Sequence, residues 1–322
     1  MKQYIVSVDF GGTKILAALL DEKGKQYARS KISTEAGSAS SALIEKLVEL
    51  IKSVIEEGGI TQKDVKSVCI GIPGSVNPYT GFIGTAPNLG IVNLNIKDEL
   101  KKHLSIPIFI ENDVNLAALG IKEFELDGKA KNVLVVYVGT GIGGALIFDN
   151  TIYRGSSFFA GEIGHMNIEK NGPLCGCGHK GCFEAIASRT AIVRDIKKDL
   201  RKGKRSILNK IVPKGKQIKS KSLMQAVKKN DPVTVKHVNH ASEIIGVNLA
   251  NLANLLNLDL IVLGGGVIEA MDKYMLPRIK ESFKKYVLKD AGKNIKIIAT
   301  KLGDEAALFG GLVLSKEMTS KK

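Results

Sequence analysis

Three of the four cysteines, Cys175, Cys177 and Cys182, lie within eight residues of one another, with glycines between them that allow sharp turns. In a reducing compartment such crowding favours a metal ion over disulfides. Three thiolates and one imidazole make a closed tetrahedral zinc site, and two histidines are close enough in sequence to complete it. His165 lies ten residues upstream, and His179 lies inside the segment. The sequence therefore predicts a structural Cys₃His zinc site, the alternative being three free thiols in a loop.

A second group of residues has the composition of a phosphate-binding site. The segment Asp9–Lys14 reads Asp-Phe-Gly-Gly-Thr-Lys and ends an apolar run. Its carboxylate can hold hydrated Mg²⁺, its amides and hydroxyl can contact phosphoryl oxygens, and its lysine can offset developing charge. The segment is neither a Walker A loop nor a Rossmann fingerprint. Two further glycine turns, Gly139–Gly144 and Gly264–Gly266, also follow apolar runs, and together the three turns predict a nucleotide site.

The elements that must position these residues alternate between strands and helices. β-rich runs separated by glycine-containing turns predict strands, and apolar residues at helical spacing predict helices. A loop rich in Gly, Pro and Asn is expected over residues 73–95. The expected strands are 4–10, 15–20, 27–32, 65–72, 106–110, 133–138, 142–148 and 260–263, and the expected helices are 43–55, 115–124 and one beginning near residue 304.

The two predicted hairpins resemble one another. A shift of 128 residues superimposes Gly11 on Gly139 and Ala17 on Ala145, each between two β-rich runs. The order of hairpin, helix and strand also recurs. The repeat predicts two related α/β domains, each offering a glycine turn to a cleft between them.

The basic character of the chain is regional. Residues 194–236 carry 15 Lys and Arg against 3 Asp, which is net +12 of the chain's +15. The segment has no aromatic residues for base stacking, so a solvated lysine-rich face is expected, with polyanion binding as the alternative. The amino terminus lacks the apolar core of a secretory signal, and no segment is apolar and long enough to span a bilayer. A cytoplasmic protein that binds neither membrane nor nucleic acid is expected.

Five segments, in order and spacing, resemble the ROK family (repressors, open reading frames and sugar kinases) of the actin-like ATPase superfamily. They are Asp9–Lys14, Gly139–Gly144, Ala160–His165, Cys175–Glu184 and Gly264–Val267. The family signature Cys-x-Cys-Gly-x-x-Gly-Cys-x-Glu occurs without a substitution. The resemblance implies a two-domain α/β fold of actin-like, ribonuclease-H-like topology with an interdomain cleft. It also implies a small domain of residues 1–113 and 304–322, and a large domain of 114–303 that carries the zinc loop 165–184.

The resemblance also implies roles for individual residues. Asp113, which by its position before a helix would most simply be an N-cap, becomes the general base that accepts the proton of a sugar 6-hydroxyl. His165 becomes both zinc ligand and sugar ligand, and His179 a bystander; Glu111 receives no role. The expected sugar ligands are Gly74, Asn88, Asn112, Asp113, Glu162, His165 and Glu184. The expected contacts to ATP and Mg²⁺ are Asp9, Gly11, Gly12, Thr13, Lys14, Gly139, Thr140, Gly141, Gly143, Gly264, Gly265 and Gly266.

A kinase is expected rather than a repressor. ROK repressors carry a helix-turn-helix domain before the Asp-x-Gly-Gly-Thr segment, which begins here at residue 9. The segment Pro87–Gly90 resembles that of ROK glucokinases, although Ile91 stands where Trp is frequent. Glucose is therefore the expected sugar, with mannose, fructose, N-acetylglucosamine and N-acetylmannosamine as alternatives. Polyphosphate is the alternative phosphate donor, and a homodimer is expected from the family.

Overall fold

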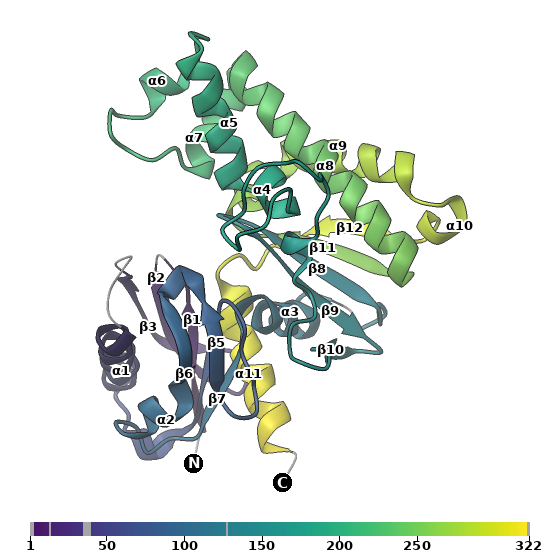
Figure 1. Cartoon of the computed structure of the whole chain (residues 1–322). Coiled ribbons are helices and arrows are strands. Elements are labelled where there is room, and N and C mark those ends of the chain that lie inside the picture. The colour runs from purple at the N-terminus through teal and green to yellow at the C-terminus, as the bar shows by residue number, and fades with distance from the viewer. Residues whose placement is uncertain (1–2, 13, 35–39, 127, 321–322) are drawn as a thin grey trace. The chain divides into compact units, whose positions relative to one another are not determined.

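The computed structural model describes residues 3–12, 14–34, 40–126 and 128–320, and its contacts group into two compact units. The first unit comprises residues 1–129, 151–160 and 304–322, and the second comprises 130–150 and 161–303. Each unit has a sheet with helices beside it and its own apolar core (Figure 1). The predicted mixed α/β class with two domains of sheet and helices is confirmed.

The first sheet has the strand order β3-β2-β1-β4-β7. β1 pairs antiparallel with β2 and parallel with β4, and β4 pairs parallel with β7. β1, β2 and β4 are buried apolar runs, as expected for strands covered on both faces, whereas the edge strand β3 is polar and largely exposed. Their bounds are β1 Tyr4–Phe10, β2 Lys14–Asp21, β3 Gln26–Ser33, β4 Val65–Ile72 and β7 Ile108–Asn112.

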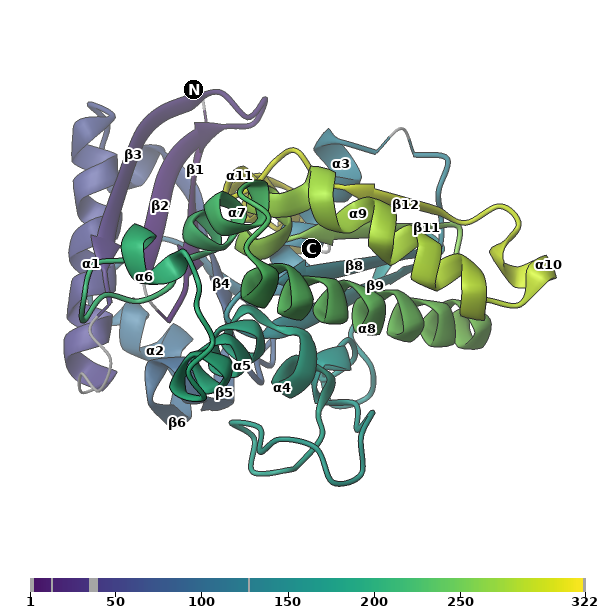
Figure 2. The same cartoon turned by 90° about the horizontal axis from the view of Figure 1, so that it is seen from above.

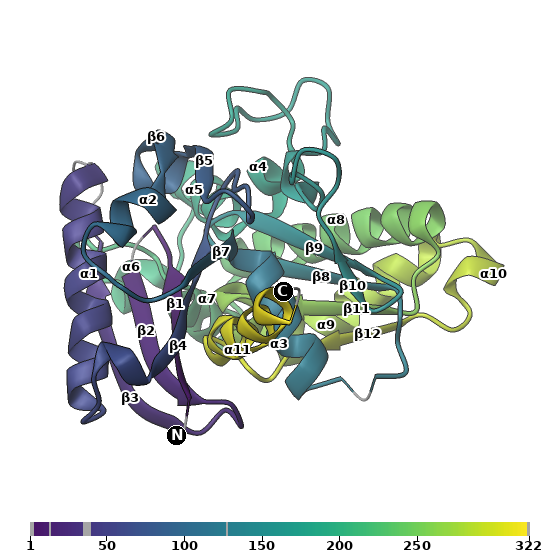
Figure 3. The same cartoon turned by 90° about the horizontal axis from the view of Figure 1, so that it is seen from below.

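Helices cover this sheet. α1 (Ser40–Glu57) buries eight apolar residues at helical spacing, and α2 (Ile96–Lys101) is capped by the side chain of Asn95. α3 (Asp113–Phe124) and α11 (Glu305–Thr319) lie side by side (Figure 3). A Cβ on Gly120 would lie 2.0 Å from the carbonyl oxygen of Ala306, so only glycine permits this approach. Because α3 packs on α11, α3 belongs to the first unit. The boundary expected at residue 113 lies instead at the first residue of α3.

The loop expected over residues 73–95 is wrong in part, because it contains a small hairpin. β5 (Phe82–Ala86) and β6 (Ile91–Asn95) pair antiparallel, and the 3₁₀ turn η2 (Pro87–Leu89) joins them. Ile83, Ala86 and Ile91 are buried. The glycines, proline and asparagines that favour turns hide these two short strands in the sequence.

The second sheet has the order β10-β9-β8-β11-β12, which repeats the first. β8 pairs antiparallel with β9 and parallel with β11, as β1 does with β2 and β4. The repeat predicted from the sequence is therefore confirmed by topology. The bounds are β8 Val133–Val138, β9 Ile142–Phe148, β10 Thr151–Tyr153, β11 Leu260–Gly264 and β12 Lys296–Ala299.

Most helices of the second unit come after the cysteine-containing loop in the sequence. The two longest, α8 and α9, run side by side (Figure 2), and Gly246 lets them approach closely. In the lysine-rich segment, apolar side chains such as Leu208 and Leu223 are buried while most lysines are exposed. The bounds are η3 Ile163–His165, α4 Phe183–Ala187, α5 Arg189–Arg201, α6 Leu208–Ile211, α7 Ser220–Lys228, α8 Pro232–Leu256, α9 Gly266–Tyr286 and α10 Lys289–Gly292. Within the described residues, no helix has the length and apolarity that crossing a membrane requires.

Candidate active site

The carboxyl ends of three parallel strands bring the predicted residues of the first unit together. In the strand register, Asp9 of β1 is opposite Gly71 of β4, and Gly71 is opposite Glu111 of β7. The chain leaves these strands at the Gly11–Gly12 turn, at Gly74 and at Asp113. In open α/β sheets, ligands bind at this edge.

Contacts between glycines and their neighbours show how closely these segments approach. A Cβ on Gly12 would lie 2.9 Å from both the Cβ and the carbonyl oxygen of Asn88. Gly74 has a φ of +99°, and a Cβ there would lie 2.3 Å from the carbonyl oxygen of Thr85. The predicted phosphate turn thus lies against a predicted sugar ligand, in positions that only glycine allows. Thr13 lies outside the described residues.

Asn112, not Asp113, is the N-cap of α3. Its Oδ1 accepts hydrogen bonds from the amides of Val114 (2.9 Å) and Asn115 (3.1 Å), and its Nδ2 donates to the carbonyl oxygen of Gly74 (3.3 Å). Asp113 is the first residue of the helix, and its Oδ1 accepts from the Val114 amide (2.9 Å). The role of N-cap, which is the simple alternative for Asp113, is therefore taken by Asn112.

Glu111 and Arg154 are residues that sequence reasoning missed. The Glu111 side chain is buried, and its Oε2 accepts from Arg154 Nε (2.8 Å) and Nη2 (2.7 Å). The signal available in the sequence was a charged residue in an apolar strand, after Ile108 and Ile110. A buried charge requires a partner, but nothing in the sequence points to Arg154.

Asp9 lies at the end of β1 with Lys14 and Asp304 nearby. Burial raises the pKa of the Asp9 carboxyl to about 6; the charge of Lys14 opposes this rise and the charge of Asp304 adds to it. The ammonium of Lys14 forms an ion pair with Asp304. A carboxylate whose ionisation is costly in the protein alone is suited to a divalent cation, which would stabilise its charged form.

The second and third glycine turns meet in the second unit. Gly265 has a φ of +85°, and a Cβ there would lie 2.7 Å from the carbonyl oxygen of Val138, which ends β8. Gly265 also caps α9, so the amides of that helix begin beside the Gly139–Gly141 turn. The amino terminus of a helix next to a glycine turn favours anion binding.

The start of α5 holds the second glycine turn from one side. The Arg189 amide donates to the Gly139 carbonyl (2.9 Å), and its guanidinium donates to Thr140 Oγ1 (2.6 Å). Thr190 Oγ1 donates to the Thr140 carbonyl (2.7 Å). Sequence reasoning also missed these two residues, because neither is part of a glycine turn.

Glu184 links the same turn to the cysteine cluster. Its Oε2 accepts from the Ile142 amide (3.2 Å), and its Oε1 lies 3.1 Å from the Sγ of Cys175. Glu162 Oε2 lies 3.9 Å from His165 Nε2, and burial raises the pKa of Glu162. The structure therefore brings the predicted sugar residues of the second unit, Glu162, His165 and Glu184, to the edge of the cysteine cluster.

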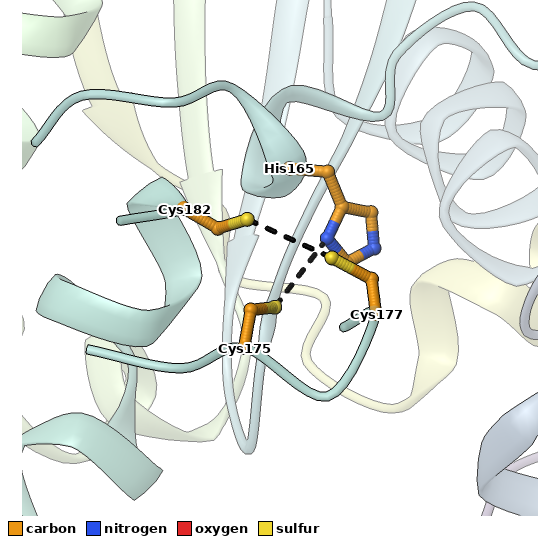
Figure 4. A group of neighbouring side chains, drawn as sticks. All are labelled: His165, Cys175, Cys177 and Cys182. Carbon is orange, nitrogen blue, oxygen red and sulfur yellow. Dashed lines mark hydrogen bonds between the residues drawn. The ribbon is translucent and has the colours of Figure 1, made fainter. Parts of the chain in front are cut away.

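The four predicted zinc ligands form one group (Figure 4). Their ligand atoms all lie within 4.8 Å of one another. Cys177 and Cys182 have their sulfurs 3.7 Å apart, and Cys175 Sγ lies 3.7 Å from His165 Nδ1. Zn–S bonds of ~2.3 Å in a tetrahedron place two sulfurs ~3.8 Å apart, so the cluster fits zinc.

The histidine that completes the cluster is His165. His179 Nδ1 lies 3.5 Å from Cys177 Sγ, but His179 is not part of the group whose ligand atoms all lie close together. Because His165 turns Nδ1 to the sulfurs, its Nε2 faces Glu162. A metal on Nδ1 would fix the tautomer and the ring orientation of His165.

The repeated sheet order and the glycine turns define an actin-like ATPase fold, as seen in solved ROK kinases. One of these, a ROK family glucokinase from Streptomyces griseus in complex with glucose and AMPPNP, has a TM-score of 0.86 and 29% sequence identity, covering 98% of this chain and 99% of that chain. The sequence profile of the ROK family matches residues 5–318. This chain belongs to the ROK family, which confirms the resemblance.

Two curated relatives show the range of the family. A glucokinase of Halalkalibacterium halodurans is 32% identical over 99% of this chain and 98% of its own length. A xylose repressor of Caldicellulosiruptor bescii is 29% identical over 96% of this chain and 77% of its own length. Fold and family are thus common to kinases and repressors, so the site must decide function.

We expect Asp9→Asn to stabilise the ligand-free protein at high pH. Because the folded-state pKa is raised above 3.8, the charged carboxylate destabilises the fold as pH rises through that value, and the full cost is present above pH 6. The rise corresponds to at most ~3 kcal/mol, and solvent contact of the partly buried side chain reduces it. Urea unfolding should show a gain of ~1–2 kcal/mol at pH 8 that disappears at pH 3.

Asp64→Asn is the matched control, with the opposite sign. Hydrogen bonds from Thr61 lower the pKa of Asp64, so its stabilisation is present above pH 3.8 and lost in acid. The variant should be less stable than the parent at pH 8. A constant stability difference for Asp9→Asn from pH 3 to pH 8 would contradict the prediction.

We expect the parent to bind about one zinc ion per chain, the capacity of a single Cys₃His site. Cys177→Ser and His165→Ala each remove a ligand and should lose the metal on dialysis. His179→Ala should keep it, because His179 is outside the group. Metal analysis by mass spectrometry measures all four proteins, and zinc lost from His179→Ala but retained in His165→Ala would reverse the assignment.

Proposed function

We propose that this chain is an ATP-dependent hexose kinase that transfers the γ-phosphate to the 6-hydroxyl of glucose. The observation that carries the proposal is the arrangement at the edge of the first sheet. There the Gly12 turn lies against Asn88, and Asn112 holds both Gly74 and the first turn of α3, where Asp113 lies. The nearly full-length similarity to a glucokinase supports it.

In this mechanism Asp113 is the general base. It accepts the proton of the 6-hydroxyl as that oxygen attacks the γ-phosphorus, and the bond to the β-phosphate oxygen breaks so that ADP leaves. Asp9 would hold hydrated Mg²⁺, which neutralises phosphate charge when bound. Lys14 adds positive charge, and the amides of Gly11 and Gly12 contact phosphoryl oxygens.

In the second unit, the remaining glycine turns would contact the nucleotide. The Gly139–Gly141 turn and the amino terminus of α9 supply amides for phosphate oxygens, and Gly264–Gly266 allows a nucleotide to pass close to the backbone. Support comes from the close approach of Gly265 to Val138 and from the tether of Thr140 to Arg189.

The sugar would be recognised by fixed acceptors and donors. Glu162, His165 and Glu184 are candidates in the second unit, and Asn88 and Asn112 in the first. His165 offers Nε2 to a hydroxyl while zinc would bind Nδ1, which keeps the ring in one orientation. Such polar sites discriminate strongly between sugars that differ in one hydroxyl, because an unmatched buried group is costly.

A panel of sugars and donors tests the proposal. ADP release should be fastest with glucose among glucose, mannose, fructose, N-acetylglucosamine and N-acetylmannosamine, with ATP and Mg²⁺. Polyphosphate is the second donor to test, because the exposed lysines between α5 and α7 offer it a basic surface. Polyphosphate-driven turnover that falls steeply with salt would favour that donor. No phosphorylation of any sugar would overturn the kinase assignment.

We expect Asp113→Asn to reduce kcat by about 10²–10⁴-fold, the usual contribution of a positioned base. Sugar affinity by calorimetry should stay within a few-fold of the parent, since the amide still hydrogen-bonds a hydroxyl. Asp98→Asn removes an exposed carboxylate from the first turn of α2 and should leave kcat unchanged. Retained turnover in Asp113→Asn would show that Asp113 is not the base.

A further inference from the structure

Glu111 is a buried carboxylate with four donors. Only 1% of its surface is exposed, and the Arg154 side chain is 15% exposed. Two donors come from the guanidinium to Oε2. Oε1 accepts the other two hydrogen bonds, which the Asn112 amide (3.0 Å) and Asn115 Nδ2 (3.1 Å) donate. The charge is therefore paired and hydrogen-bonded, which is the condition for burying it.

The two donors to Oε1 flank Asp113. Asn112 precedes it and caps α3, and Asn115 lies two residues later with its amide in that cap. Asp113 thus lies between two residues that one carboxylate oxygen holds. The backbone of Gly71 in β4 also lies close to Asp113. A Cβ on Gly71 would be 3.2 Å from the Cα of Asp113, so β4 limits movement of the Asp113 backbone toward it.

Arg154 connects Glu111 to the short loop 154–160. The Arg154 carbonyl accepts from the Ala160 amide (3.1 Å), which closes a short loop. Within that loop the Phe158 ring packs edge-on against Tyr79, with ring centres 5.7 Å apart. The guanidinium therefore joins the end of β7 to a loop that also contacts the turn after β4.

We propose that Glu111, held by Arg154, is a positioning residue that fixes the carboxylate of Asp113 for proton transfer. This inference rests on the proposed function. A hydrophobic pair of similar volume is often as stable as a buried ion pair, so stability alone does not account for one here. A charged pair with directed hydrogen bonds holds its neighbours in a single geometry. The proposed base, Asp113, requires such a fixed geometry.

Two double variants separate positioning from folding. Glu111→Met with Arg154→Met removes both charges and the Oε1 acceptor, and leaves no unpaired buried charge. We expect kcat to fall about 100-fold, the scale of a misplacement near 1 Å, with KM for sugar and ATP within about threefold. Glu111→Gln with Arg154→Met keeps the Oε1 acceptor, so it should recover most of the lost turnover.

A second ion pair in the same unit gives the matched control. Lys66 Nζ lies 2.9 Å from Glu22 Oε1 at the surface, and Lys66→Met with Glu22→Gln should leave kcat unchanged. Hydrogen exchange provides a readout that does not depend on activity. The amides of Val114 and Asn115, both bonded to Asn112, should exchange faster in the Met/Met variant, whereas core amides of β4 should not.

The outcomes distinguish the two proposals. A lower kcat at unchanged KM, with recovery in the Gln variant, supports positioning. Parental kcat in the Met/Met variant overturns it, even if Asp113→Asn is inactive and the kinase assignment stands. If the parent phosphorylates no sugar, the proposed function fails. The role in proton transfer then fails with it, and the exchange of Val114 and Asn115 shows separately whether Glu111 orders the first turn of α3.

Discussion

Parallel pairing of β1, β4 and β7 is the constraint on which the candidate site residues of the first unit depend. Parallel strands end at one edge, so residues far apart in sequence emerge side by side wherever their strands are in register. Asp9, Gly71 and Glu111 share one row of the sheet. Consecutive residues of these strands are buried, so the core holds each strand from both faces of the sheet. The core therefore positions the polar edge.

The second unit uses the same device with different side chains. β8 and β11 are parallel, and their ends carry the glycine turns at Gly139 and Gly265. In each unit the turn of the hairpin joins the first strand of the parallel set. The two units place their glycine turns alike because they share a strand order. Their sequences share few residues at equivalent places. Gly12 in the first unit and Gly265 in the second do not occupy equivalent places, but at each of them a Cβ would collide with neighbouring backbone.

The parts of the structure that the sequence predicts are those with a local signal. Apolar runs placed β4, β8 and β9 at their observed bounds, and cysteine spacing located the group of three cysteines and a histidine. The β5–β6 hairpin was missed because its strands are short and rich in turn formers. Glu111 and Arg154 are 43 residues apart, and their pairing depends on tertiary packing that no periodicity reports. The choice between His165 and His179 likewise depended on the family resemblance, until geometry grouped His165 with the cysteines.

The cysteine cluster and the second glycine turn are joined by one short stretch of chain. Cys182 is the N-cap residue of α4, Glu184 lies in its first turn, and Ser188 caps α5, where Arg189 begins the tether to Thr140. A helix of five residues is too short to be stable alone, so α4 depends on what holds its ends. At one end that is the cysteine cluster, and at the other the cap of α5. A ligand on the four clustered side chains would therefore order Glu184 and, through it, the Ile142 amide to which it is bonded. The loop 165–184 therefore bears on the geometry of the second glycine turn, because Cys182 begins the short helix that carries Glu184.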